Sequence, residues 1–253
     1  MIENPFYNEL KKLFGDDLIY FDKVESTNNI AKDLLKSDTM HGKLIVAEQQ
    51  SGGRGSHGRS FVSPSGGIYM SVIIKNPPLP PSLLTTYSAV CVCRALEKLF
   101  DCDCKIKWVN DIFVSGKKVC GILTEGIYSG SKLESAIIGI GINLSPQPDA
   151  FSGELSSIAG SILTTLATPI QKTALIKAVY DNILSSISDI SEKSFLAEYE
   201  NRLFIIGKNI EYIENNITHI AKVIGIDDEA RLIVSDGTTE KHLLSGDVLL
   251  KFV

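Results

Sequence analysis

The stretch Gly52-Gly53-Arg54-Gly55-Ser56-His57-Gly58-Arg59 holds four glycines and two arginines within eight residues. Glycine at this density costs conformational entropy, so a stable domain keeps it where the backbone approaches something closely or adopts a positive φ. Backbone N–H groups freed in this way, with guanidinium groups beside them, make a site for an anion such as a phosphate or a carboxylate. On composition alone, a solvated surface loop is as well supported as an anion site, because glycine-rich loops are common connections.

The apolar pattern on both sides of this glycine loop predicts strands, at 44–47 before it and 67–75 after it. Prolines at 77–81 end the second strand, and Pro81 suits the first turn of a long helix that runs to Phe100. Helical spacing predicts further helices, one of which Ser26 or Thr27 would cap. The expected helices are 5–14, one after residue 26, 171–188 and 192–203, and the other expected strands are 18–24, 105–109, 112–114, 118–125 and 133–142.

The sequence pattern changes after Gly207, where short strand candidates separated by Asn, Asp and Gly predict a small barrel or sandwich. A unit of this size is too small to be comfortably stable alone, so we expect it to pack on the main body. The sequence therefore predicts an α+β fold, in which a mixed sheet flanked by helices (1–205) is followed by a small β domain (206–253). The strand candidates lie near 209–214, 218–226, 230–235, 238–243 and 247–252.

Composition excludes several classes of protein. The chain has 253 residues, of which 44% are hydrophobic, and a net charge of −5. With a pI near 5.5 it lacks the broad basic surface of a nucleic-acid-binding protein, so no nucleic-acid partner is expected. No run approaches the roughly 18 apolar residues of a membrane span, and the N-terminus does not resemble a signal peptide. We expect a cytoplasmic protein.

Five cysteines, at 91, 93, 102, 104 and 120, are an odd number, which indicates reduced thiols. Their C-x-C spacing is not the C-x-x-C of common metal sites, and residues two apart on a helix point about 200° apart. We interpret them as packing residues rather than metal ligands, and we predict no metal site made by protein side chains.

A second dense stretch, 105–111, leads through the turn Ser115-Gly116-Lys117 to Lys118. That hairpin would place Asp111 and Lys118 on adjoining strands, facing each other. With the arginine loop nearby, such a pair would form a site that carries both charge signs and binds a phosphate. The alternative is an ordinary cross-strand ion pair, which contributes little to stability.

The third stretch is Gly139-Ile140-Gly141 within a predicted strand. Glycine inside a strand often marks a place where a ligand lies against the backbone. The stretch lacks the third glycine and the following helix of a dinucleotide fingerprint, and no P-loop motif occurs elsewhere.

Together these stretches resemble the biotin–protein ligases, also called biotin–[acetyl-CoA-carboxylase] ligases. The tail, with Gly225-Ile226-Asp227 and Ser245-Gly246-Asp247-Val248, is similar to the small SH3-like C-terminal domain of that family. The resemblance covers roughly residues 18 to 251. The catalytic pieces occur in the family's order: 25–28, Gln50 with 53–55 and 58–59, 63–64 with 67–71, 107–111 without 109, 118 with 121–123 and 125, and 139–143.

This resemblance implies a two-step reaction on biotin as substrate. The biotin carboxylate attacks the α-phosphorus of ATP, with Mg²⁺, to give biotinyl-5′-AMP and pyrophosphate. A lysine amine of a biotin carboxyl carrier domain, from acetyl-CoA carboxylase or a related carboxylase, then attacks the mixed anhydride and releases AMP. The resemblance leaves the assembly open between a monomer and a homodimer.

The resemblance also implies the site residues. Arg54 and Lys118 would be catalytic, neutralising charge on the carboxylate and the α-phosphate, and both would contact biotin and nucleotide. Asp111 would position or deprotonate the incoming lysine, and Asn143 would lie by the nucleotide. The other biotin contacts would be Ser26, Thr27, Asn28, Gln50, Gly55, Ser56, Gly121 and Gly139.

Three departures accompany the resemblance, because family members often have Arg, Trp and Pro where this chain has Ser56, Phe61 and Val109. Only about 24 residues precede Ser26, which is too few for the DNA-binding domain of repressor-type relatives, so we expect the ligase-only form. Two alternatives are a lipoate-type acyl-adenylate ligase, whose R-R-x-S-G-G-G pattern is absent, and a non-catalytic protein that binds biotin or a carrier domain.

Overall fold

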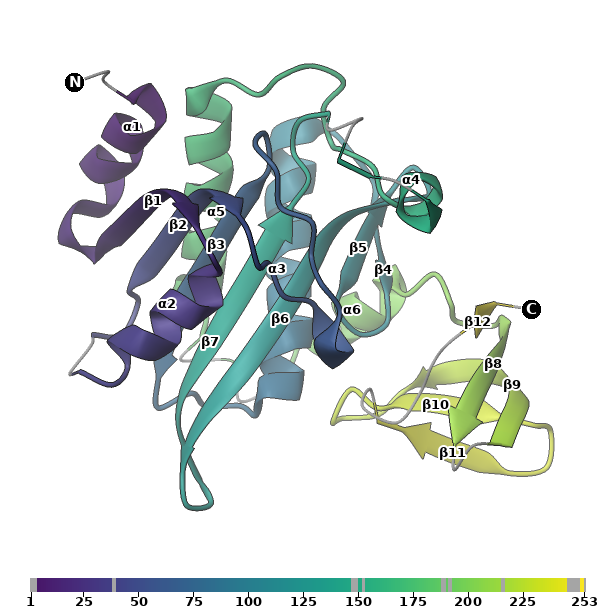
Figure 1. Cartoon of the computed structure of the whole chain (residues 1–253). Helices are drawn as coiled ribbons and strands as arrows, with labels where there is room; N and C mark the ends of the chain where they lie inside the picture. Colours follow the sequence, from purple (N-terminus) through teal and green to yellow (C-terminus); the bar gives the residue numbers. More distant parts are fainter. Residues whose placement is uncertain are drawn as a thin grey trace.

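The structure is a computed structural model that describes residues 4–37, 40–146, 150–151, 153–187, 190, 193–214, 217–244 and 251–252. A seven-stranded sheet of order β1-β2-β3-β7-β6-β5-β4 forms its centre (Figure 1). Strands β1 and β2 pair in parallel, and the other neighbours are antiparallel. The strands are β1 (Leu18–Val24), β2 (Leu44–Gln50), β3 (Ile68–Lys75), β4 (Cys104–Lys107), β5 (Asp111–Val114), β6 (Lys117–Ser129) and β7 (Lys132–Ile142).

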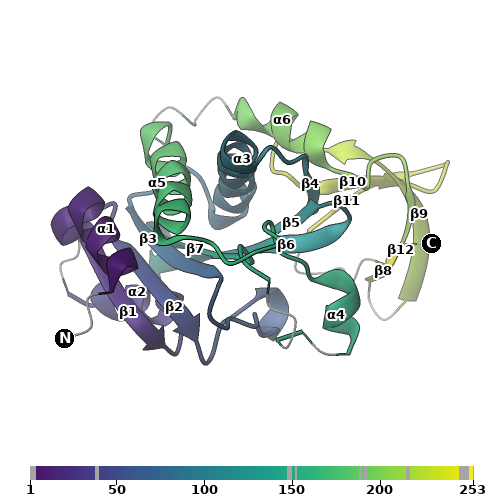
Figure 2. The same cartoon turned by 90° about the horizontal axis from the view of Figure 1, so that it is seen from above.

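Helices cover both faces of this sheet, as the view from above shows (Figure 2). Helices α3 (Pro81–Phe100), α5 (Pro169–Ser185) and α6 (Phe195–Arg202) lie on one face. Helix α2 (Thr27–Leu34) lies on the other, packing Ala31 against Ile45, Ile73 and Ile137 of the sheet. The remaining helices are α1 (Pro5–Phe14), α4 (Glu154–Ile158) and the 3₁₀ turns at Gly15–Asp17 and Ser56–Gly58.

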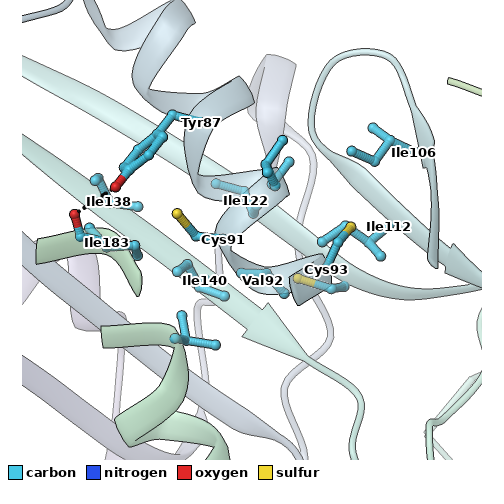
Figure 3. Close-up of a cluster of buried hydrophobic side chains, with 14 of the residues drawn as sticks. Tyr87, Cys91, Val92, Cys93, Ile106, Ile112, Ile122, Ile138, Ile140 and Ile183 are labelled. Carbon is cyan, nitrogen blue, oxygen red and sulfur yellow. Dashed lines mark hydrogen bonds between the residues drawn. The ribbon is translucent and has the colours of Figure 1, made fainter. Parts of the chain in front are cut away.

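The main core lies between α3 and the sheet (Figure 3). Cys91 and Cys93 of α3 are fully buried there, and the Tyr87 hydroxyl of the same helix donates to the Ile183 carbonyl at 2.9 Å. All five cysteines are free thiols; four are buried, and Cys102 packs against the core. The predicted packing role of the cysteines is therefore confirmed.

A second, five-stranded sheet of order β11-β10-β9-β8-β12 follows α6 and fits an SH3-like domain. The buried Trp108 joins this sheet to the main body, because its indole N–H donates to the Ala230 carbonyl at 2.9 Å. Residues 245–250 lie outside the described part, so the expected strand at 247–252 is seen only at its end. The strands are β8 (Asn209–Glu214), β9 (Ile217–Ile226), β10 (Leu232–Ser235), β11 (Glu240–Leu243) and β12 (Lys251–Phe252).

Several element boundaries differ from the prediction by a few residues: β2 continues to Gln50 rather than 47, β4 ends at Lys107 rather than 109, and α5 ends at Ser185 rather than 188. Two further differences have identifiable reasons. Strand β6 continues past Gly126 to Ser129, because the β6–β7 hairpin closes only at Gly130, where φ is +58°. Helix α5 begins at Pro169, since Thr168 and Gln171 form a reciprocal capping box at its N-terminus. Among the described residues, no helix is long and apolar enough to cross a membrane.

Candidate active site

A cavity of about 150 Å³ opens on the α2 face of the central sheet. Its walls are the first turn of α2, the glycine loop, strands β6 and β7, and the turn before β5. Every predicted site residue except Asn143 lines it, so residues from five separate stretches meet in one place. These residues are Ser26, Thr27, Asn28, Gln50, Arg54, Gly55, Ser56, Asp111, Lys118, Gly121 and Gly139.

The glycine loop folds back on itself at the mouth of this cavity. The Gly55 amide donates to the Arg59 carbonyl at 2.7 Å, and the Phe61 amide donates to the Gly53 carbonyl at 2.8 Å. A Cβ atom at Gly53 would lie 2.3 Å from the Phe61 carbonyl oxygen, so only glycine permits this close approach. The high glycine content thus serves a tight backbone crossing beside the cavity.

Glycines in β6 and β7 line the cavity and also make room for side chains that pack against them. Gly121 and Gly141 are paired across the two strands, and the Phe61 ring lies over both of them. A Cβ atom at Gly141 would come within 2.4 Å of that ring, and one at Gly139 would come within 2.2 Å of the Asn28 amide oxygen. Because these glycines lack a Cβ atom, the Phe61 and Asn28 side chains can pack against them and form part of the cavity wall.

The end of the cavity beside α2 is polar and almost completely buried. Ser26 occupies the N-cap position of α2, although its side chain makes no capping hydrogen bond. The Thr27 amide donates instead to Gln50 Oε1 at 2.9 Å, and Gln50 Nε2 donates to Ser63 Oγ at 3.0 Å. These contacts fix the Gln50 amide, so this end presents a set of donors and acceptors with defined positions.

The opposite end of the cavity is charged. Lys118 Nζ lies 2.6 Å from Asp111 Oδ1, which confirms the predicted facing of the two side chains. Lys107 lies in the cross-strand position next to Asp111. Burial lowers the pKa of Lys107; the Asp111 carboxylate opposes this shift, whereas the nearby charges of Lys118 and Arg59 add to it. Positive charge from Lys118 and Arg59 therefore gathers around Lys107 and Asp111, which is an arrangement suited to a bound anion.

Arg54 reaches from the glycine loop toward α2. Its guanidinium donates to Asn29 Oδ1 at 3.2 Å and lies 3.5 Å from Glu125 Oε1. Glu125 also accepts from Lys32 at 2.7 Å and from Asn28 at 2.8 Å. Burial alone would raise the pKa of Glu125, but the hydrogen bonds from Lys32 and Asn28 outweigh it, so the pKa is lowered and the group remains a carboxylate.

Asn143 lies beside the cavity rather than in its lining. Its backbone amide donates to the Val119 carbonyl at 2.8 Å, while its buried side-chain oxygen has no hydrogen-bond partner among the described residues. A buried acceptor without a partner is unfavourable, so it marks a place where a donor from a ligand or a water would be stabilising.

Sequence reasoning assigned no role to several residues that the structure brings into the site. Asn110 donates to Ser56 Oγ and to the Ile122 carbonyl, both at 2.8 Å, and so fastens the glycine loop to β6. Asn110 and Glu125 belong to the motifs quoted above, and Phe61 is one of the departures from the family pattern. Their contacts cross between distant stretches, which spacing alone does not reveal. The lining residues without a predicted role are Arg59, Ser60, Phe61, Asn110, Ile122, Leu123, Ile140, Gly141 and Leu155.

Comparison with known proteins places this chain in a class of protein ligases. Residues 20–143 match the biotin/lipoate A/B protein ligase family. The chain is 34% identical to the bifunctional ligase/repressor BirA of Bacillus subtilis over 246 residues, which covers 94% of this chain and 75% of that protein. It is 32% identical to a biotin–[acetyl-CoA-carboxylase] ligase of Paracoccus denitrificans over 135 residues, 51% of this chain and 55% of that one.

The fold is shared with solved structures of the same class. The biotin protein ligase from Aquifex aeolicus, solved in complex with biotin and ATP, superposes with a TM-score of 0.78 at 24% identity and covers 93% of this chain and 99% of that one. The chain belongs to the biotin/lipoate A/B protein ligase family, and within it to the biotin protein ligases.

Proposed function

We propose that this protein is an ATP-dependent biotin–[acetyl-CoA-carboxylase] ligase. It converts biotin and ATP to biotinyl-5′-AMP and pyrophosphate, and then transfers the biotinyl group to a lysine of a carrier domain. The observation that carries the proposal is the cavity itself, because one continuous space joins a fixed polar end to an end lined by Lys118, Asp111 and Arg59. Such a space suits a ligand with a small polar ring at one end and a carboxylate at the other, where the carboxylate reacts with a phosphate.

The polar end would hold the ureido ring, which offers two N–H donors and a carbonyl acceptor. Ser26, Thr27, Asn28 and Gln50 supply side chains of matching types, with Gly55, Ser56, Gly121 and Gly139 completing the wall. The Phe61 ring, lying over Gly121 and Gly141, would cover the apolar part of the ligand.

The charged end would carry the chemistry. As the biotin carboxylate attacks the α-phosphorus, negative charge builds on the phosphate oxygens. Lys118 would offset it from this end, and Arg54 would do so by turning from its contact with Glu125 beside α2. Both cations rest against carboxylates, Lys118 on Asp111 and Arg54 on Glu125, so both are oriented within the site. Asn143, with its unpartnered side-chain oxygen, would lie by the nucleotide.

Mg²⁺ enters this proposal as part of the MgATP substrate. Within the described residues, no group of three or more His, Cys, Asp or Glu side chains is placed to hold a metal ion. The phosphate oxygens of ATP would therefore coordinate the ion, which neutralises charge on the leaving pyrophosphate.

The second step requires a carrier lysine to reach the mixed anhydride. Asp111 would receive that amine, because a carboxylate can orient an incoming ammonium group and accept its proton before the nitrogen attacks the acyl carbon. The partner in this step would be a biotin carboxyl carrier domain of acetyl-CoA carboxylase or a related carboxylase. We also propose that residues 1–205 form the catalytic domain and 206–253 an SH3-like domain.

The test is to incubate the purified protein with biotin, MgATP and a biotin carboxyl carrier domain, and to measure the mass of the carrier. We expect a gain of one biotinyl group that depends on ATP and on the target lysine of the carrier. Lipoate in place of biotin serves as the specificity control. Labelling with lipoate but not with biotin would replace this proposal by the lipoate-type activity, and no labelling with either acid would contradict it.

A further inference from the structure

Glu125 lies behind the polar end of the cavity, and its carboxylate can only accept hydrogen bonds. One oxygen accepts from Lys32 Nζ at 2.7 Å, and the other accepts from Asn28 Nδ2 at 2.8 Å. Because both partners are donors, the Asn28 amide has one permitted orientation, with its nitrogen toward Glu125 and its oxygen away from it.

The fixed Asn28 amide determines the next hydrogen bond. Asn28 Oδ1 lies 2.6 Å from the hydroxyl of Ser71, a fully buried residue of β3. An amide oxygen cannot donate, so Ser71 must give its single proton to Asn28. The Ser71 oxygen is left with lone pairs only.

The same constraint passes on to Thr27. The Ser71 and Thr27 hydroxyl oxygens are 2.8 Å apart, whereas Thr27 Oγ1 and Gln50 Oε1 are 3.2 Å apart. Since Ser71 has no second proton, the shorter contact requires Thr27 to donate to Ser71. Gln50 Oε1 already accepts from the Thr27 backbone amide, so it does not need the hydroxyl proton.

Thr27 lines the cavity, and with its proton turned toward Ser71 it presents only lone pairs to a ligand. We infer that Glu125 is a positioning residue that sets the direction of the hydrogen-bond chain Glu125–Asn28–Ser71–Thr27, so that Thr27 Oγ1 accepts from an N–H group of the bound ring. This inference rests on the proposed function, because the ring it orients is the ureido ring of biotin.

A carboxamide at position 125 should reverse the direction of this hydrogen-bond chain. Glu125→Gln leaves one oxygen for Lys32 at 2.7 Å, Asn28 at 2.8 Å and the more distant Arg54 at 3.5 Å. The lysine, as a charged donor, holds that oxygen more strongly, so the new amide nitrogen faces Asn28 and the Asn28 amide turns over. The chain then runs the other way, and Thr27 points a proton at an N–H group of the ligand.

The experiment measures the Kd of biotin by calorimetry for the wild type, Glu125→Gln, Lys32→Met and the double variant, with the Tm of each. We expect Glu125→Gln to bind at least about tenfold more weakly, since a buried ligand donor loses its acceptor. Lys32→Met keeps both carboxylate oxygens and should stay within about threefold of the wild type. In the double variant Asn28 competes for the single oxygen only with Arg54, which lies at 3.5 Å rather than at the 2.7 Å of Lys32, so most of the lost affinity should return.

Recovery of biotin affinity in the double variant distinguishes this inference from a merely structural role of Glu125. If Glu125 were only structural, Glu125→Gln would lower the Tm, and adding Lys32→Met would not restore the affinity. Wild-type affinity in Glu125→Gln, or a double variant as weak as Glu125→Gln, overturns the inference while leaving the proposed function intact. A wild type that binds no biotin overturns the proposed function and this inference with it.

Ser71→Ala supplies a second route that does not alter the charges. It removes the link between Asn28 and Thr27, so adding Glu125→Gln to it should change the Kd by less than about twofold. A further tenfold loss in that background would show that Glu125 does not act through the chain.

Discussion

Lys118 Nζ lies 2.6 Å from Asp111 Oδ1 at the charged end of the cavity, and both side chains are less than one-third exposed. Strands β5 and β6 bring them together across a hairpin whose turn residues, Ser115 and Gly116, have φ of +50° and +75°. The pair places a cation for the reacting phosphate beside a carboxylate for the incoming amine. The two steps of the reaction can therefore be separated by mutation.

Lys118→Ala should abolish adenylation, because it removes a charge directed at the developing phosphate charge. Loss of one such group costs about 10²- to 10³-fold in rate, and Arg54→Ala should have a similar effect. Biotin-dependent exchange of pyrophosphate into ATP measures this step alone. Normal exchange in Lys118→Ala would remove Lys118 from the adenylation machinery.

Asp111→Asn should instead impair transfer more than adenylation. The amide keeps the size of the side chain but cannot take a proton or pair with an ammonium group. Single-turnover transfer from preformed biotinyl-AMP to the carrier should slow by about 10²-fold or more, while pyrophosphate exchange changes much less. Equal losses in both assays would contradict the assignment.

Gly141→Ala should disturb the cavity through Phe61. The added Cβ would lie 2.4 Å from the ring, closer than real Cβ contacts allow, so the ring must move. Overpacking of this kind costs about 1–3 kcal/mol, and the KM for biotin should rise. Phe61→Ala removes the clashing ring, so the free energies of unfolding in a double-mutant cycle should show strong coupling between the two sites. Additive effects would mean that the ring does not occupy this groove.

Ser56→Arg should slow the release of biotinyl-AMP. The Ser56 side chain accepts a hydrogen bond from Asn110 at 2.8 Å, which fastens the glycine loop, whereas an arginine would add a charge-assisted contact to the adenylate. Such a contact contributes about 1.5–3 kcal/mol, or about tenfold in rate for each 1.4 kcal/mol. Stopped-flow displacement of the adenylate measures the release, and Ser56→Ala, which loses the Asn110 contact, should release it faster. Equal rates in all three proteins would show that other residues hold the loop.

Asp227 should make the stability of the second sheet depend on acid pH. Burial alone would raise its pKa, but hydrogen bonds from His242 and Arg231 outweigh this and lower the pKa to about 2. A carboxyl group whose pKa is lower in the folded protein stabilises it above the unfolded pKa of about 3.9. That contribution is lost as the pH falls through the folded pKa.

Urea unfolding of the wild type and Asp227→Asn therefore should show a difference in free energy that shrinks as the pH falls from about 5 toward 3. Asp228→Asn is the matched control, because Asp228 is 81% exposed and lies 3.7 Å from Lys193. An exposed pair of this kind contributes little at any pH. A pH-independent difference for Asp227→Asn would contradict the assignment.

The sequence by itself determined the elements and most of the site. Periodicity placed α1 and β1 at their observed bounds, because an apolar face every 3.6 or 2 residues is a local property. The hairpin between Asp111 and Lys118 was equally local, since only six residues with a glycine turn separate them, although a bulge between Ile112 and Phe113 shifts the register of the pairing. Eleven of the twelve predicted site residues line the cavity, with Asn143 beside it. Their motifs came from the resemblance, not from periodicity.

Only the tertiary structure decided which side chains from distant segments contact one another. That Gly139 admits Asn28, and that Gly141 admits Phe61, depends on how α2 and the glycine loop pack on β7. Glu125 reaches Asn28 from a position 97 residues away in the sequence. The orientation of a carboxamide and the direction of a hydroxyl proton depend on which donors and acceptors meet in space, and no local pattern in the chain encodes that meeting.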